Sequence, residues 1–205
     1  MVRKVVHFQC LKDENSREPE VQGIKRAGKL TELEIRVIES FKGPTDPTVL
    51  AGATHVTIGG SGWSVWDDVP FKRELRNTIR SAIYEFGIPT LGICFGAQFL
   101  ASITYGGKVV RDDARAETGP TEIVRTHPMA QYDLLEGLPS KFMAESSHHD
   151  RIVRLPMNMV PLAYSQGGQV IQAFADTGEK CWGVQFHPER GTGHDAQILE
   201  KFFLL

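Results

Sequence analysis

A single cysteine between two glycines is the strongest chemical signal in this sequence. Cys94 lies in "LGICFGAQFL", where Gly92 and Gly96 flank it in the pattern G-x-C-x-G. This pattern is typical of a sharp strand-to-helix turn that exposes its middle residue, and the glycines let neighbouring backbone approach closely. The start of a helix presents unpaired N–H groups and the positive end of the helix dipole, which favour a thiolate. Cys94 is therefore a candidate nucleophile, and the alternative is a small buried hydrophobic residue.

A thiol nucleophile needs a base, and the base needs an orienting group. Both occur late in the chain, in "GVQFHPERG", where His187 follows an apolar strand and Glu189 stands two residues further on. The intervening proline excludes a regular helix there. A nearby carboxylate can fix the tautomer of the imidazole and stabilise the imidazolium. The alternatives are a structural histidine and a solvated carboxylate.

A glycine-rich segment could complete such a site. Residues 57–62, "TIGGSG", follow an apolar strand, and the backbone N–H groups of such a loop could face a substrate oxygen. The N–H of Phe95, the residue after the candidate nucleophile, would point to where a tetrahedral oxyanion forms. The glycine at 65 that a dinucleotide-binding G-x-G-x-x-G would need is absent, because Val65 stands there, and no phosphate-loop lysine follows. An ordinary turn is the alternative.

The segments that must position these residues alternate between strand-like and helix-like patterns in the first half of the chain. The apolar spacing predicts strands over 4–8, 33–40, 54–60 and 88–93, and helices over 18–27, 71–86 and 95–105. Strands that alternate with helices indicate a parallel sheet covered on both faces.

The second half changes character. Short strand-like segments occur in "KVV", "TEIVRT", "KFMAES" and "MVPLAYS", and "QVIQAFADTGEKCWGVQF" predicts two strands joined by a turn over 176–179. A final helix is expected over 195–203. The patterns together predict one α/β domain over residues 1–205, a flavodoxin-like three-layer sandwich. Its central sheet would be mostly parallel, with extra antiparallel strands from the second half.

Composition narrows the class of protein. The formal net charge is −2, and no basic run interleaved with aromatic residues indicates binding to nucleic acid. No stretch approaches the roughly 20 apolar residues of a membrane helix, and the first residues do not resemble a signal peptide. Three cysteines are too few for a disulfide framework and fit a reducing compartment. We expect a cytoplasmic protein with no membrane, nucleic-acid or cofactor requirement.

The remaining histidines and cysteines give weaker signals. Cys10 and Cys181 lack flanking glycines and are predicted to be packing residues. His7, His55 and His127 belong to no recognisable constellation and are predicted to be structural or exposed.

A metal site is the other possibility for histidines in this chain. His148 and His149 are adjacent, and His194 and Glu189 could join them, but no zinc-binding spacing is present. We therefore predict no metal site.

Taken together, these motifs resemble the class I glutamine amidotransferases. "GGSG", "LGICFGAQFLA" and "GVQFHPE" occur in the order and at roughly the spacing of that family, and the resemblance covers most of the chain. Residues 145–156, "ESSHHDRIVRLP", resemble the S-H-x-D-x-V segment of its GMP-synthase-like branch. Ser61 departs from the family, in which proline is common at that position, and "HFQCLKDENSREPE" does not match the start of GMP synthase subunits. These departures leave the pathway open.

The resemblance implies a role for each matching residue. Cys94 would attack the side-chain amide of glutamine and form a γ-glutamyl thioester with release of ammonia, while His187 would act as general base and acid and Glu189 would orient it. Gly60 and Phe95 would supply oxyanion N–H groups. The substrate would be held by Gly59, Gln98, Ser147, His148 and His149, the last three through their backbone.

Three functions remain open at this point. The first is a glutaminase that passes ammonia to a synthetase or acceptor subunit, since the length leaves no room for an acceptor domain. The second is a γ-glutamyl hydrolase acting on γ-glutamyl amines or peptides with the same triad. The third is a binding module without catalysis. Trp63 and Trp66 lie near the expected mouth of the site without an assigned role.

Overall fold

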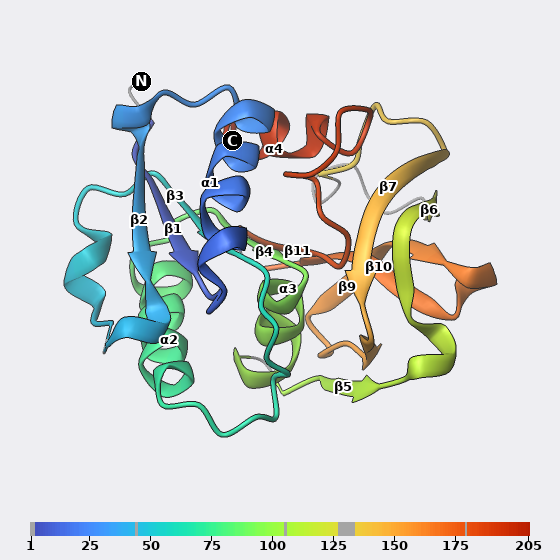
Figure 1. Cartoon of the computed structure of the whole chain (residues 1–205), viewed down its shortest axis with the longest axis horizontal. Helices are drawn as coiled ribbons and strands as arrows, with labels where there is room; N and C mark the ends of the chain where they lie inside the picture. The colour runs from blue at the N-terminus through green and yellow to red at the C-terminus, as the bar shows by residue number, and fades with distance from the viewer. Residues whose placement is uncertain (1–2, 44, 105, 127–133, 179) are drawn as a thin grey trace.

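The computed structural model describes residues 3–43, 45–104, 106–126, 134–178 and 180–205, and its core is a nine-stranded mixed sheet (Figure 1). Predictions that concern Tyr105, His127 and Glu179 fall outside the described residues. In order across the sheet, the strands are β2 (Ile35–Glu39), β1 (Val5–Gln9), β3 (His55–Ile58), β4 (Thr90–Ile93), β11 (Cys181–Val184), β10 (Val170–Asp176), β9 (Met159–Ser165), β6 (Glu117–Arg125) and β7 (Lys141–His148). The first five strands pair in parallel and the last four add antiparallel neighbours, as the sequence predicts.

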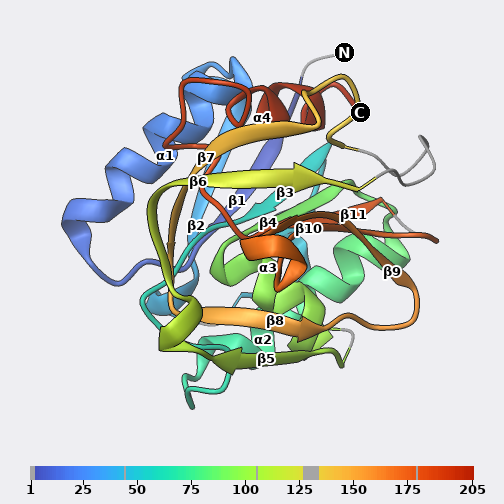
Figure 2. The same cartoon turned by 90° about the vertical axis from the view of Figure 1, so that its right-hand side faces the viewer.

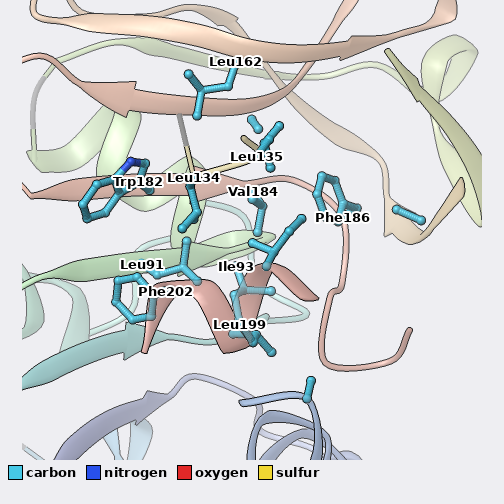
Figure 3. Packing of buried hydrophobic residues seen from close by; sticks show 14 of the residues in the cluster. Leu91, Ile93, Leu134, Leu135, Leu162, Trp182, Val184, Phe186, Leu199 and Phe202 are labelled. Carbon is cyan, nitrogen blue, oxygen red and sulfur yellow. The ribbon is translucent and has the colours of Figure 1, made fainter. Parts of the chain in front are cut away.

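A cluster of buried apolar side chains lies on each face of this sheet, and helices cover both clusters. Every residue of β1 is buried, as expected for a parallel strand that is covered on both faces, and this includes the polar His7 and Gln9. On one face, α1 (Glu14–Gly28) and α4 (Gln197–Phe202) pack over strand residues such as Leu91 and Val184 (Figure 3). On the other face, α2 (Phe71–Arg80) and α3 (Phe95–Phe99) pack over residues such as Ile58. The three-layer α/β prediction is confirmed.

Helices α2 and α3 each continue into a π-helical turn instead of ending in regular α-helical geometry. The predicted helix over 71–86 is α2 followed by a π-helical turn at Ser81–Glu85, and the helix over 95–105 is α3 followed by a similar turn at Leu100–Thr104.

Three local predictions differ from the structure. The first helix begins at Glu14 rather than at 18, because Arg17 ties its first turn to the carbonyls of Leu11 and Lys12 despite Pro19 inside the helix. Leu33 lies in a 3₁₀ turn before β2 and is 97% exposed, so the strand begins two residues later than predicted.

The third difference concerns strand pairing. β5 (Lys108–Arg111) does not join the main sheet but pairs antiparallel with β8 (Asp150–Arg154), a strand that the sequence analysis did not identify. This pair lies apart from the main sheet on the side of α2 and α3 (Figure 2). Only residue 149 separates β7 from β8, and the first residue of β8 lies beside α3, since its carbonyl accepts a hydrogen bond from Gln98 Nε2.

No helix in the described ranges has the length and apolarity needed to cross a lipid bilayer.

Candidate active site

Cys94 occupies the junction between β4 and α3 in a strained conformation. Its φ is 52° and its ψ is −106°, which a residue with a side chain rarely adopts. A Cβ atom at Gly92 would lie 2.4 Å from the carbonyl carbon of Gly96, and one at Gly96 would lie 2.2 Å from the carbonyl oxygen of Ile58. The close backbone approach predicted for the two glycines is therefore present, and it forms the turn that presents the thiol.

His187 and Glu189 form a buried pair beside this cysteine. His187 Nδ1 lies 2.7 Å from Glu189 Oε1, and both side chains are almost fully inaccessible to solvent. His187 Nε2 is buried and has no hydrogen-bond partner among the described residues. The main-chain N–H of His187 donates to the carbonyl of Glu145 on β7 at 2.7 Å, which fixes the start of the turn. The free Nε2 is thus the nitrogen available to exchange a proton with a neighbouring thiol.

The charges around His187 favour its protonated form. Burial acts to lower the pKa of His187, but the negative charges of the Cys94 thiolate and the Glu189 carboxylate outweigh it and raise the pKa to about 10. Because the neighbouring sulfur contributes to this shift, Cys94 and the His187 imidazole interact directly, as a cysteine nucleophile and its base would.

Helix α1 positions the carboxylate of this pair through the backbone of Glu189. Arg26 Nη2 donates to the Glu189 carbonyl at 2.8 Å. Gly23, on the same helix, lets the two backbones approach so closely that a Cβ atom there would lie 2.3 Å from the Glu189 carbonyl oxygen. The first helix and the segment after β11 are therefore in direct contact behind the site.

Gly23→Ala is expected to reduce stability and to disturb the His187–Glu189 pair, because its methyl group cannot fit without displacing Glu189. Overpacking of this kind costs about 1–3 kcal/mol. The measurements are the urea-unfolding midpoint and the rate of Cys94 alkylation by iodoacetamide. Gly43→Ala is the matched control, since a Cβ atom at Gly43 would have no atom of another described residue within 4 Å, its chain neighbours aside. Equal behaviour of the two variants would contradict a positioning role for α1.

A pocket of about 240 Å³ opens above the Cys94 sulfur. Its lining residues are Ser61, Gly62, Trp63, Ser64, Cys94, Phe95, Gln98, Arg111, Ser147, His148, His149 and Asp150. The structure thus brings six of the predicted site residues to one cavity, whereas Gly59, Gly60, His187 and Glu189 lie outside its lining. Trp63 lines the cavity and packs against Phe71 with ring centroids 5.4 Å apart, while Trp66 is half-exposed.

The glycine loop shows an arrangement that the sequence analysis did not anticipate. The Gly60 N–H, predicted to bind an oxyanion, donates instead to Glu20 Oε1 on α1 at 2.9 Å. Glu20 is 6% exposed, and its Oε2 lies 3.1 Å from Nε2 of buried His7. Gly60 also packs against the His187–Glu189 pair, since a Cβ atom there would lie 3.2 Å from His187 Cε1. In this conformation the Gly60 N–H is engaged by a carboxylate, so the predicted oxyanion role requires the loop to move.

Glu20→Ala is expected to destabilise the fold by about 2–4 kcal/mol, because it leaves His7 and the Gly60 N–H buried without their acceptor. Chemical unfolding measures this change. Glu18→Ala is the control on the same helix, since Glu18 is exposed and pairs only with Gln22 among the described residues. A loss below about 0.5 kcal/mol for Glu20→Ala, as expected for surface positions, would show that the network contributes little.

Residues 147–150, where β7 ends and β8 begins, line the pocket, and the side chain of His148 among them is buried. His148 Nδ1 lies 3.0 Å from the carbonyl of Asp150, and its Nε2 lies 2.9 Å from Glu117 Oε2. His149 pairs with Asp113 at 2.8 Å. Asp150 accepts a hydrogen bond from Ser64 Oγ at 2.6 Å, and its Oδ1 is buried without a partner among the described residues. The backbone contribution predicted for this segment is compatible with these contacts.

Two polar residues around the site, Gln185 and Glu20, were not predicted from the sequence. Gln185 is fully buried with Nε2 3.8 Å from Cys94 Sγ, and Glu20 reaches the glycine loop as described above. Signals for both exist in the sequence. Gln185 precedes His187 by two residues, the spacing at which extended side chains share a face. Glu20 lies four residues before buried Ile24, on the apolar face of its helix.

The other cysteines and histidines show packing roles. Burial, together with the charge of Glu20, raises the pKa of the Cys10 thiol, so this sulfur stays protonated. Cys181 is also buried and reduced. His55 packs edge-on against Phe202 and Phe203. Within the described ranges, no three side chains of His, Cys, Asp or Glu are grouped so as to hold a metal ion.

Comparison with known proteins agrees with this fold. The family model for "Glutamine amidotransferase class-I" matches residues 43–205, which include the elbow and the segment of His187 and Glu189. The chain therefore belongs to the class I glutamine amidotransferase family.

The relatives of this chain include enzymes named GMP synthase. The chain is 34% identical over 158 residues to the glutamine-hydrolysing GMP synthase of Aeropyrum pernix, covering 76% of this chain and 28% of that protein. It is 39% identical over 143 residues to the corresponding enzyme of Porphyromonas gingivalis, covering 70% and 26%. The chain thus spans about a quarter of the length of these relatives. A solved structure of a candidate GMP synthase subunit from Thermoplasma acidophilum has the same fold, with a TM-score of 0.80, 24% identity, and coverage of 99% and 93%.

Proposed function

We propose that this protein hydrolyses the side-chain amide of glutamine through Cys94, His187 and Glu189, and that the released ammonia serves an acceptor reaction in a partner. One observation carries the proposal. A cysteine with positive φ presents its sulfur to a polar pocket, directly beside a buried histidine–carboxylate pair whose free nitrogen has no other partner among the described residues.

The geometry supports a two-step displacement. His187 Nε2 takes the proton of Cys94, and the sulfur forms a bond to the amide carbon of glutamine. When the C–N bond breaks, the imidazolium returns the proton to the leaving nitrogen and ammonia departs from a γ-glutamyl thioester. Water, deprotonated by His187, then cleaves the thioester to glutamate and frees the thiol. Glu189 holds the imidazole through Nδ1 in both steps.

The oxyanion formed in each step requires hydrogen-bond donors. Phe95 begins α3, so its N–H has no acceptor within the helix and is suited to this role. Gly60 would be the second donor after its N–H leaves Glu20. Bound glutamine would be contacted by Gln98 and by the backbone of residues 147–149, which line the pocket. A contact from Gly59 would need the same loop movement, since its carbonyl now accepts from the Gly96 N–H at 3.2 Å.

The acceptor of the ammonia belongs to the proposal as well. The relatives named glutamine-hydrolysing GMP synthase are three to four times as long as the matched segment, because it covers 26–28% of them. Because the solved structure of the same fold is named as a GMP synthase subunit, we propose that residues 1–205 act as one glutaminase domain and that a synthetase subunit in trans receives the ammonia in the cytoplasm.

The test compares amide substrates and labels the nucleophile. Purified protein is incubated with glutamine and with γ-glutamyl methylamide, and ammonia, methylamine and glutamate are quantified. A chloroketone derived from glutamine is used as the label, and peptide mass spectrometry locates it. Ammonia release from glutamine with the label on Cys94 supports the proposal. Efficient cleavage of the methylamide with poor cleavage of glutamine would indicate a γ-glutamyl hydrolase, and the absence of both turnover and label would indicate a module without catalysis.

A further inference from the structure

The side chain of Gln185 contacts the nucleophilic sulfur from within the protein. Gln185 is fully buried just after β11, and its Nε2 lies 3.8 Å from Cys94 Sγ. Its Oε1 accepts a hydrogen bond from Gln98 Nε2 at 3.1 Å. Gln98 Nε2 also donates to the main-chain carbonyl of Asp150 at 3.0 Å. A chain of two amides therefore connects the substrate-facing segment after β7 to the sulfur.

The ability of each group to donate or accept a hydrogen bond determines which end of the Gln98 and Gln185 amides faces which neighbour. A backbone carbonyl can only accept, so Gln98 must direct its NH₂ group toward Asp150. The second hydrogen of that group points to Gln185, which must therefore present its oxygen to Gln98. The NH₂ group of Gln185 is then left facing Cys94 Sγ. The main-chain N–H of Gln185 donates to the carbonyl of Gln172 at 2.8 Å, which holds the backbone in place.

The Cys94 sulfur has two hydrogen-bond contacts, one suited to the neutral thiol and the other to the thiolate. The Cys94 thiol, when neutral, can donate to the carbonyl of Ser147, which lies 3.8 Å away. A thiolate has no hydrogen to donate and is repelled by that oxygen, but it accepts strongly from an N–H. The amide of Gln185 is placed to supply that hydrogen bond in a site closed to water on its inner side.

We propose that Gln185 is a further catalytic residue, which rests on the proposed function above: its side-chain N–H donates to Cys94 Sγ and stabilises the thiolate that attacks the substrate. No proton is transferred in this contact. The hydrogen bond weakens once the sulfur has become a neutral thioester, so it favours the charged nucleophile and returns when the thiolate is regenerated. Gln98 contributes indirectly, as the residue that fixes the orientation of the Gln185 amide.

The primary test replaces the donor with a side chain of similar size. In Gln185→Met the N–H is lost while the volume is retained. The readout is the rate of Cys94 alkylation by iodoacetamide as a function of pH, with the modified peptide assigned by mass spectrometry. A hydrogen bond to a charged group is lost, so we expect alkylation at pH 7 to slow about tenfold or more and its pH midpoint to move upward. The KM for glutamine should change less than kcat, because Gln98 stays in the pocket.

A second variant separates this role from a loss of folding. Gln185→Glu keeps the shape and the acceptor for Gln98 but places a carboxylate beside the sulfur, and it should slow alkylation at least as much as Gln185→Met. Gln22→Glu makes the same chemical change on the exposed face of α1 and should leave alkylation unchanged. The thermal unfolding midpoint is recorded for each variant, and only variants that unfold cooperatively are compared.

The outcomes distinguish this proposal from the proposed function. Alkylation needs no glutamine, so a slower reaction in both Gln185 variants supports the donor role whatever the natural substrate is. Wild-type alkylation rates in a folded Gln185→Met and a folded Gln185→Glu would overturn it. A Cys94 that reacts no faster than a free thiol in the wild type would instead count against the proposed function.

A double variant tests the orienting role of Gln98. If Gln98 acts by fixing the Gln185 amide, Gln98→Leu should slow alkylation by itself and should add little in the Gln185→Met background. If the two substitutions slow alkylation by factors that simply multiply in the double variant, Gln98 does not act by orienting the Gln185 amide.

Discussion

Cys94→Ala is expected to lower ammonia release from glutamine by about 10⁴-fold or more, because in the proposed mechanism the sulfur forms the covalent intermediate. Cys94→Ser is expected to be nearly as inactive. A hydroxyl is a far weaker acid than a thiol, so His187 cannot generate a charged nucleophile from it as readily. Steady-state ammonia release measured with a coupled dehydrogenase assay gives both values.

The control for this prediction is a second buried cysteine. Cys181→Ala removes a sulfur of the same size from β11, on the strand next to β4 but outside the pocket lining. We expect its activity to stay within about threefold of the wild type, and the glutamine chloroketone should still label Cys94. Substantial hydrolysis by Cys94→Ala would show that the reaction does not pass through this residue.

Glu189→Gln is expected to lower kcat by about 10³–10⁴-fold and to change its pH dependence, because the amide neither holds the imidazole tautomer nor carries a charge. In the wild type the imidazolium that protonates the leaving nitrogen persists until the pH approaches the His187 pKa of about 10. Activity should therefore fall as the pH rises through that value. Loss of the Glu189 charge removes one cause of the raised pKa, so the alkaline limb should move down by about 1–3 pH units.

A matched change elsewhere isolates this effect. Glu200→Gln makes the same substitution on α4, where the carboxylate pairs with exposed Lys29. The alkaline limb of its kcat profile should coincide with that of the wild type. An unchanged limb in Glu189→Gln would show that this carboxylate does not set the charge state of His187.

Features that depend on local sequence could be predicted. The elbow at Cys94 needs two glycines and a strand-to-helix change, and all of these are visible within ten residues. The buried strands of the first half show as apolar runs, and the helices between them show their spacing, so the layered α/β fold follows. His187 and Glu189 are two residues apart, so their pairing is also a local property.

Features that depend on distant contacts could not be predicted. Glu20 resembles a surface residue in a charged segment until α1 packs on the glycine loop, 40 residues further on. Gly23 shows its role only where α1 meets the Glu189 carbonyl. β8 was missed because Asp150, Arg151 and Arg154 leave it a short apolar pattern, and its pairing with β5 satisfies the backbone without a place in the main sheet.

The contacts of α1 also bear on how short an active fragment of this protein can be. The family match begins at residue 43, and a fragment starting there would contain Cys94, His187 and Glu189. It would lack Arg26, which binds the Glu189 carbonyl, and it would expose an edge of β3 that β1 now covers. A fragment that begins at residue 43, where the family match begins, is therefore expected to lack glutaminase activity. The stretch that identifies the family is shorter than the stretch that must fold to hold the proposed catalytic residues in place.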